Sequence, residues 1–347
     1  MNVSAVTIQC WIMLVLLAFP ALAQRAKAPA MEHRLAVTER RLAESSTRSV
    51  KTVVVWRENP NLADLNVLEG PGGLNHSPGT DFQFIKESEG GTSPKFVVKD
   101  ENGVRWKVKL GPEAKPETAA SRLMWAAGYS SDDDYYRSEI RVAGMKKILH
   151  GAPYTSEGGV VHEARLERID EQTKPRHWNW QKAPEGQTRE FNGLRVMMAL
   201  LNNWDLKTEN NSIHDHAVKG QFYVVSDLGA SFGRTGDSFL RSKGVLQDYA
   251  QAKFIRLVKG DQVDFVMHSR PFFLSVIFRP DYYIRRTRIE RITKHIPLAD
   301  ARWLGHQLGR LSERQIGDCF RAAGYSASEV EGYTRVVFQR IEALKAL

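Results

Sequence analysis

Four short segments of the chain carry side chains whose types and spacing could act together on a phosphate group. Asp205 and Asn210 have the spacing Asp-x-x-x-x-Asn, and Asp227 lies in an Asp-x-Gly segment after an apolar run. Lys109 ends a strand-like segment that follows the sequence GGTS at 90–93. Phosphoryl transfer from a nucleotide needs a carboxylate facing the attacking hydroxyl, oxygen ligands for Mg²⁺, a lysine on the phosphates and a glycine loop over them. The chain offers all of these parts in the expected order.

Each segment also has an ordinary explanation when it is taken alone. Asp-x-Gly and Gly-Gly-Thr-Ser sequences are common in turns, and an acidic residue in the first turn of a helix is favoured by the helix dipole. Their occurrence together, in order and on suitable elements, favours a site for phosphate chemistry.

The elements that must position the first half of this site read as strands followed by a helix. Three alternating segments separated by turn sequences predict strands: 81–88, 95–100 and 104–110. Residues 117–127 then have a helical pattern, with Pro116 suited to the first helical position and Gly128 to its end.

The second half reads as mainly helical. Residues 189–204 form an amphipathic helix, and the sequence HDHAVKG after Ile213 indicates the turn of a hairpin whose second strand leads to Asp227. Ser312 and Gln315 can make a capping box, and Gly324 ends that helix. The last helix carries an apolar stripe that we expect in the core: Val330, Tyr333, Val337, Ile341 and Leu344.

Composition limits the function classes. The chain has 347 residues, 42% of them hydrophobic, and a formal net charge of +9, which excludes a collagen or a wholly disordered chain. Its two cysteines, Cys10 and Cys319, cannot make a disulfide scaffold or a cysteine zinc site. No basic-aromatic array of the kind that stacks on nucleic acid is visible. The basic stretch 285–294 predicts an amphipathic surface helix, with lipid headgroups or an acidic substrate as candidate partners.

The first residues predict export. An apolar run at 11–20 is followed by Ala-x-Ala, the pattern of a signal peptide over residues 1–23 with cleavage after Ala23. We therefore expect a secreted or periplasmic protein, with residues 24–64 as a polar linker or extension.

Two of the segments resemble a known family. DLKTEN at 205–210 resembles the protein-kinase catalytic loop H-R-D-L-K-P-E-N, and DLG at 227–229 resembles D-F-G. Asn203 and Trp204 replace His-Arg, however, and no A-P-E follows. With its GGTSPKFVVKDENG stretch the chain is more similar to atypical kinases: type II phosphatidylinositol kinases, HipA-like bacterial kinases and the secreted casein-kinase-like family. The resemblance covers roughly residues 81–235.

The resemblance implies an α+β, two-lobed kinase-like fold. Its N-lobe, residues 65–165, would be a small antiparallel β-sheet with one helix, and its C-lobe, residues 166–347, mainly helical. The implied activity is transfer of a phosphoryl group from ATP, with Mg²⁺ or Mn²⁺, to a hydroxyl of a protein, lipid or sugar.

The resemblance also implies roles for single residues. Asp205 would be the catalytic base, Lys207 would touch the transferring phosphate, and Asn210 and Asp227 would be metal ligands. The nucleotide contacts would be Gly90, Gly91, Thr92, Ser93, Lys109 and Glu117. Glu113 rivals Glu117 as the partner of the lysine, and Lys107 rivals Lys109 as the phosphate contact.

Three other functions are compatible with the sequence. A catalytically inactive pseudokinase would serve as a binding module in the cell envelope, and Trp204 and Lys107 favour it. A nucleotidyl transferase could use the same residues with the nucleotide turned around. A structural envelope protein would bind no nucleotide.

Overall fold

The computed structural model describes residues 52–88, 93–169, 176–183, 186, 188–216, 220–235, 241–267 and 273–347. Val53–Leu347 forms one compact unit. The predicted signal peptide at 1–23 lies outside the described residues, as do Gly90, Gly91 and Thr92 of the predicted glycine loop.

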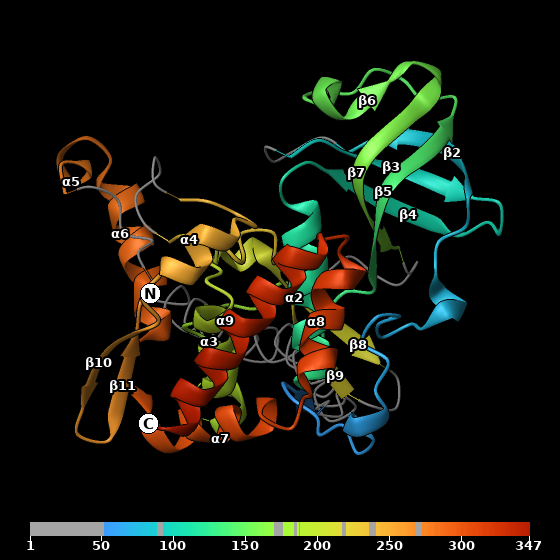
Figure 1. The fold of residues 1–347 in the computed structure, drawn as a ribbon. Coiled ribbons are helices and arrows are strands. Elements are labelled where there is room, and N and C mark those ends of the chain that lie inside the picture. Colours follow the sequence, from blue (N-terminus) through green and yellow to red (C-terminus); the bar gives the residue numbers. More distant parts are fainter. Residues whose placement is uncertain are drawn as a thin grey trace, which may run out of the picture. The chain divides into compact units, whose positions relative to one another are not determined.

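Five strands form a closed barrel with the order β4-β3-β2-β5-β7, and β4 pairs with β7 to close it (Figure 1). These strands are β2 (Asp81–Glu87), β3 (Lys95–Asp100), β4 (Arg105–Leu110), β5 (Asp134–Ala143) and β7 (Val160–Arg168). The two-residue strand β6 (Thr155–Ser156) pairs with β7.

The three strands that the sequence predicted are confirmed, but the expectation of a small antiparallel sheet is wrong. β2 and β5 pair in parallel, and the sheet closes on itself. The longer strands β5 and β7, which the sequence analysis missed, span the gap between β2 and β4. Closure gives each of these five strands a neighbour on both sides, although β2 and β5 pair only at Asp81–Gln83 and Arg141–Ala143.

Alternation along β4 separates the barrel core from the outer face. Trp106, Val108 and Leu110 are fully buried in the hydrophobic cluster inside the barrel. Lys107 and Lys109 therefore project from the opposite face of the strand.

The helix after β4 is α2 (Ala114–Ala126). It begins two residues before the predicted first position at Pro116, so Pro116 lies at the third helical position, still within the first turn, where its missing N–H costs no helical hydrogen bond. Gly128, with a φ of +93°, follows its end as predicted.

The remaining helices belong to the second half of the chain: α3 (Arg189–Leu200), α4 (Leu246–Gln251), α5 (Ser275–Phe278), α6 (Pro280–Glu290), α7 (Leu298–Leu308), α8 (Glu313–Ala322) and α9 (Ala327–Lys345). α3 ends four residues earlier than predicted. The capping box of Ser312 and Gln315 is present, Gly324 follows α8 with a φ of +70°, and the predicted stripe of α9 is buried.

Two small sheets complete the fold. One has the order β1 (Val53–Val54), β9 (Gly220–Val225), β8 (Asn211–His216). Its β8–β9 hairpin confirms the predicted one, but the predicted turn was placed too early, because 214–216 belong to β8 and pair with β9. The other, which the sequence analysis missed, is β10 (Ile255–Lys259), β11 (Gln262–Phe265), β12 (Ile296–Pro297). Short 3-10 turns join these elements at Leu62–Asp64, Leu74–His76, Ala152–Tyr154, Glu157–Gly159, Thr208–Asn210 and Arg291–Thr293.

Buried apolar side chains form two separate clusters. One fills the barrel, and the other lies among the helices and the β8–β9 hairpin. The apolar side chains of α2 belong to the helical cluster, where α2 packs on α8. The predicted boundary at residue 165 falls inside β7, and β1 pairs with β9, so residues 53–54 belong to the folded unit and not to a linker. No helix among the described residues has the length and apolar character needed to cross a bilayer.

Candidate functional site

Lys109 lies at the centre of an acidic cluster. Its Nζ is 2.5 Å from Oε2 of Glu113, 2.9 Å from Oε2 of Glu117 and 3.2 Å from Oδ1 of Asp227. The lysine comes from β4, the two glutamates from the beginning of α2, and Asp227 from the loop after β9. The fold thus brings together two residues, Lys109 and Asp227, that are 118 positions apart in the sequence.

Two further cations hold the glutamates. Arg165 of β7, which pairs in register with Lys109 of β4, places Nη2 3.1 Å from Oε1 of Glu117. Lys243 makes a close ion pair with Glu113. The cluster therefore alternates positive and negative side chains. Each buried charge has an opposite charge beside it, and their attraction offsets the cost of desolvation.

Burial and pairing shift the pKa values of these groups in different directions. Burial alone would lower the pKa of Lys109, but Glu117, Asp227 and Glu113 outweigh it and raise that pKa. Burial would raise the pKa of Glu113, but Lys109 and Lys243 lower it to about 2. For the fully buried Glu117 the burial prevails over Arg165 and Lys109, and its pKa rises to about 7. Lys109 and Glu113 therefore stay charged at neutral pH.

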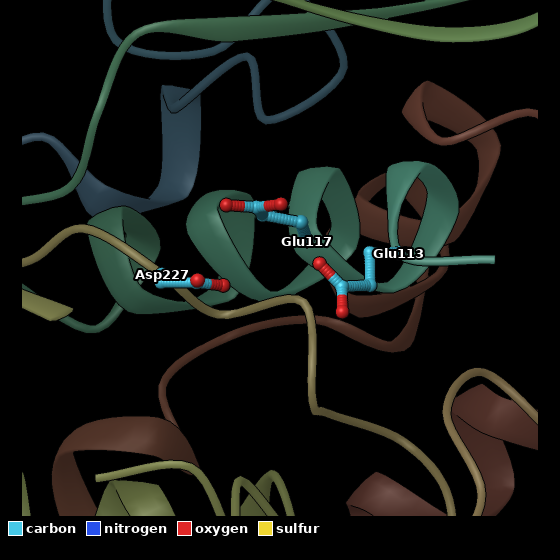
Figure 2. Close-up of side chains that lie close together, drawn as sticks. All are labelled: Glu113, Glu117 and Asp227. Carbon is cyan, nitrogen blue, oxygen red and sulfur yellow. The ribbon is translucent and has the colours of Figure 1, made fainter. Parts of the chain in front are cut away.

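Figure 2 shows Glu113 and Glu117 projecting from one helix, with Asp227 on the loop that faces it. One carboxylate oxygen of each lies within 4.8 Å of those of the other two. The loop approaches α2 closely at Gly229, where a Cβ would come within 2.8 Å of the Cβ of Glu113. The Asp-Leu-Gly segment thus needs a glycine here because a side chain would prevent the loop from packing this closely on α2. Its backbone φ is not in the positive range that favours glycine.

Asp205 lies next to this cluster and is linked to it through Asn203. The Asn203 side chain accepts a hydrogen bond from the Asp205 backbone N–H at 3.2 Å and donates one to the Asp227 carbonyl at 3.4 Å. Asn210 donates from Nδ2 to the Asp205 carbonyl at 2.6 Å and accepts at its own carbonyl from the Ser226 N–H at 2.9 Å. The two loops that contain Asp205 and Asp227 therefore form one hydrogen-bonded unit.

The carboxylate of Asp205 is flanked by two cations. Its Oδ2 is 2.8 Å from Nζ of Lys207, and its Oδ1 is 3.8 Å from Nη1 of Arg286 on α6. Oδ1 is buried and accepts no hydrogen bond from the described residues. A buried carboxylate oxygen with spare acceptor capacity is suited to receive a hydroxyl proton.

Buried side chains anchor both loops to the helices. Asn202 has a φ of +54° and donates from Nδ2 to the Gly233 carbonyl at 2.9 Å. Phe232 is fully buried against the rings of Tyr249, Phe320 and Tyr333. The SDLGASFG segment is therefore fixed at its Phe-Gly end by the helical core.

The other candidate residues lie at or near the edge of the cluster. Lys107 pairs with Glu167 at 2.9 Å, so Lys109 is the lysine of the two that meets Asp227. Lys207 is exposed and paired with Asp205. Ser93, the described residue of the predicted glycine loop, precedes β3 by two positions.

Three residues of the site were not singled out from the sequence. Arg165 lay in an unrecognised strand, and Lys243 has no local pattern that points to the site. Arg286 lay in the basic stretch that predicted a surface helix, yet it is buried while its neighbour Arg285 is exposed. Its i, i+3 spacing from the apolar Ile289 could have placed it on the inner face.

Two cavities among the described residues lie away from the cluster. A cavity of about 840 Å³ is lined by α8 and α9, and another of about 300 Å³ lies beside α3. Neither contains a candidate site residue.

Comparison with known proteins gave structural matches only. No family model and no curated protein matches the chain. The Helicobacter pylori proinflammatory kinase CtkA matches with 11% identity and a TM-score of 0.33, over 77% of this chain and 99% of that one. The Golgi casein kinase matches with 10% identity and a TM-score of 0.31, over 78% and 74%. Its structure with Mn/ADP bound matches with 11% identity and a TM-score of 0.32, over 77% of this chain and 75% of that one.

All three of these matches are to kinase structures, at identities of 10–11%. The function of the site is inferred from the contacts of the acidic cluster and not from these likenesses.

Proposed function

We propose that this protein is an exported, metal-dependent phosphotransferase with a two-lobed kinase-like fold, which moves the γ-phosphoryl group of ATP to a hydroxyl. The observation that carries the proposal is the meeting of Lys109 with Glu117 and Asp227, beside Asp205. A buried lysine held by acids from a helix and from an Asp-x-Gly loop is the arrangement that orients nucleotide phosphates.

Lys109 supplies fixed positive charge for the phosphate oxygens. Its raised pKa keeps the ammonium protonated, and Glu117 orients it while Arg165 holds Glu117 in place. Because these groups are already positioned, little reorganisation is needed when the negative charge of the nucleotide arrives.

Asp205 is the proton acceptor in this proposal. Its carboxylate, whose side chain is 20% exposed, takes the proton of the attacking hydroxyl, which raises the nucleophilicity of the oxygen as it attacks the phosphorus. Lys207, 2.8 Å from the same carboxylate, places a positive charge where the transferring group passes.

The residues present fit a hard divalent cation. Asp227, whose side chain is 39% exposed, offers a carboxylate, and Asn210 would offer its amide oxygen while its Nδ2 donates to the Asp205 carbonyl. Such oxygen donors suit Mg²⁺ or Mn²⁺. A bound ion would neutralise charge on the nucleotide phosphates.

The test is transfer of labelled γ-phosphate to a panel of protein, lipid and sugar hydroxyls, read by product mass. Asp205→Asn should keep the nucleotide-induced thermal shift but lower transfer by about 10²-fold or more, because the proton acceptor is lost. Asp215→Asn, at a carboxylate on β8 that pairs with Arg176, is the matched control and should transfer at the wild-type rate. Transfer that is unchanged in Asp205→Asn would refute the assignment, and a product heavier by a nucleotide would indicate nucleotidyl transfer.

A second candidate is a pseudokinase that binds nucleotide without turnover. The ion pairs of Asp205 with Lys207 and Arg286 favour it, because two cations compete with the acceptor hydroxyl for the carboxylate. Metal-dependent nucleotide binding with no transfer to any acceptor would support this function instead.

A further inference from the structure

Large apolar side chains are exposed together on α5 and just before it. The α5 patch, as we call it, has side chains that are 41–76% exposed and consists of Phe273, Leu274, Val276, Ile277 and Phe278. Ile284 of α6 is also half exposed. A soluble monomer rarely leaves so many neighbouring apolar side chains in water, and such a patch indicates a surface that docks on something.

Arginines follow the α5 patch in the sequence, from Arg279 along α6. Residues 279–291 contain five arginines and two acids. Arg279, Arg285, Arg288 and Arg291 are exposed, and the exposed acid Asp281 pairs with Arg285 at 3.2 Å. The segment that follows the apolar side chains is therefore net positive.

We propose that the α5 patch docks on an anionic membrane surface. Its apolar side chains would enter the boundary between headgroups and acyl chains, and the exposed arginines that follow the patch would pair with lipid phosphates. Docking of two copies through this patch would bring two arginine clusters together on chains that each carry a net charge of +9. Charge complementarity therefore favours the lipid surface over a second copy.

The α5 patch adjoins a helix that is anchored in the fold. α5 packs against α6 (Figure 1), and α6 is anchored by the buried Ile289 and by Arg286, which reaches to within 3.8 Å of Asp205. This inference does not depend on the proposed phosphotransfer, because it requires no nucleotide.

The experiment is co-sedimentation of the protein with vesicles of phosphatidylcholine alone or mixed with phosphatidylglycerol. We expect binding to the mixed vesicles only, weakened by salt. Ile277→Ser with Phe278→Ser should reduce partitioning by roughly 10-fold or more, because the inserted apolar surface is lost. Arg279→Gln with Arg288→Gln should reduce it by about fivefold per arginine.

The matched control is Leu257→Ser with Val258→Ser, which removes apolar side chains of β10 that are 52% and 46% exposed. This variant should bind as the wild type does, and a melting curve for each variant shows that it is folded. The proposal is overturned if the wild type does not bind the mixed vesicles or binds pure phosphatidylcholine equally well. It is also overturned if the control variant loses as much binding as the variant of the α5 patch. A dimer that dissociates on Ile277→Ser with Phe278→Ser would likewise overturn it in favour of a second copy.

Discussion

At the residue scale, the site is a balance of buried charges around Lys109. Glu113 and Glu117 are four positions apart, so both lie on the same side of α2 and both reach the lysine. The sequence therefore left Glu113 as a rival to Glu117 for the partner of Lys109, and in the structure both glutamates pair with the lysine. Arg165 completes the balance from a strand that the sequence analysis did not recognise.

The first prediction concerns the pH dependence of stability through Glu113. Its pKa falls from 4.5 to about 2 on folding, so its stabilising contribution is complete above pH 4.5 and is lost as the pH falls toward 2. The difference in unfolding free energy between the wild type and Glu113→Gln should be on the order of 3 kcal/mol near neutral pH and should shrink toward zero near pH 2. Urea titrations at several pH values measure it.

Glu117 provides a control, because its contribution to the unfolding free energy should change with pH in the opposite direction. Its pKa rises from 4.5 to about 7 on folding, so its contribution is present below pH 4.5 and is lost as the pH rises through about 7. If Glu113→Gln and Glu117→Gln showed the same pH trend, the charge balance described for the cluster would be wrong.

The second prediction concerns Asn203, which joins the loops of Asp205 and Asp227. Asn203→Ala removes both hydrogen bonds and should lower the unfolding free energy by about 1–3 kcal/mol. It should also speed amide hydrogen exchange in both loops. Asn102→Ala in the exposed β3–β4 turn is the control and should leave the exchange rates of both loops unchanged. Faster exchange in only one loop would show that Asn203 does not couple them.

At the element scale, local sequence signals predicted individual strands and helices better than their pairing. The turns around β3 and β4 and the glycine after α2 are local features, and they were found correctly. Closure of the barrel depends on β7 meeting β4, a contact between segments about 60 residues apart that no local pattern encodes. The loops of the site could be recognised by motif, but the contact of Lys109 with Asp227 joins residues 118 positions apart and depends on tertiary packing that no local pattern encodes.

The third prediction tests how α9 fixes the end of α3. Arg340 is buried and donates to the carbonyls of Leu200 at 2.9 Å and Tyr249 at 3.0 Å, and to Oδ1 of Asn202 at 2.9 Å. Arg340→Met should lower the unfolding free energy by about 3 kcal/mol, because these buried acceptors lose their donor. Equilibrium unfolding in urea measures the loss.

Arg335→Met on the same helix is the control. Arg335 is exposed and pairs with the exposed Glu331 one turn earlier, so its removal should cost less than about 1 kcal/mol. Equal losses in the two variants would mean that Arg340 stabilises α9 itself and not its contact with α3.

At the scale of the whole molecule, the proposed function includes export. Residues 1–23 have the pattern of a signal peptide, and the mature chain would begin at Gln24. The fourth prediction is that protein recovered from the medium or periplasm of an expressing cell starts at this residue. N-terminal sequencing reads it directly, and recovery of the uncleaved chain from the cytosol would contradict export.

The central claim is that Lys109 and Asp227 form one site for metal-bound nucleotide. The most direct measurement is the thermal shift of the purified protein with ATP, in the presence and absence of Mg²⁺ or Mn²⁺. We expect a rise in Tm that needs both ATP and metal, and that is lost in Lys109→Met and Asp227→Ala but kept in Lys107→Met, whose lysine pairs with Glu167 instead. No shift in the wild type, or a shift that survives loss of Lys109 and Asp227, would contradict the claim.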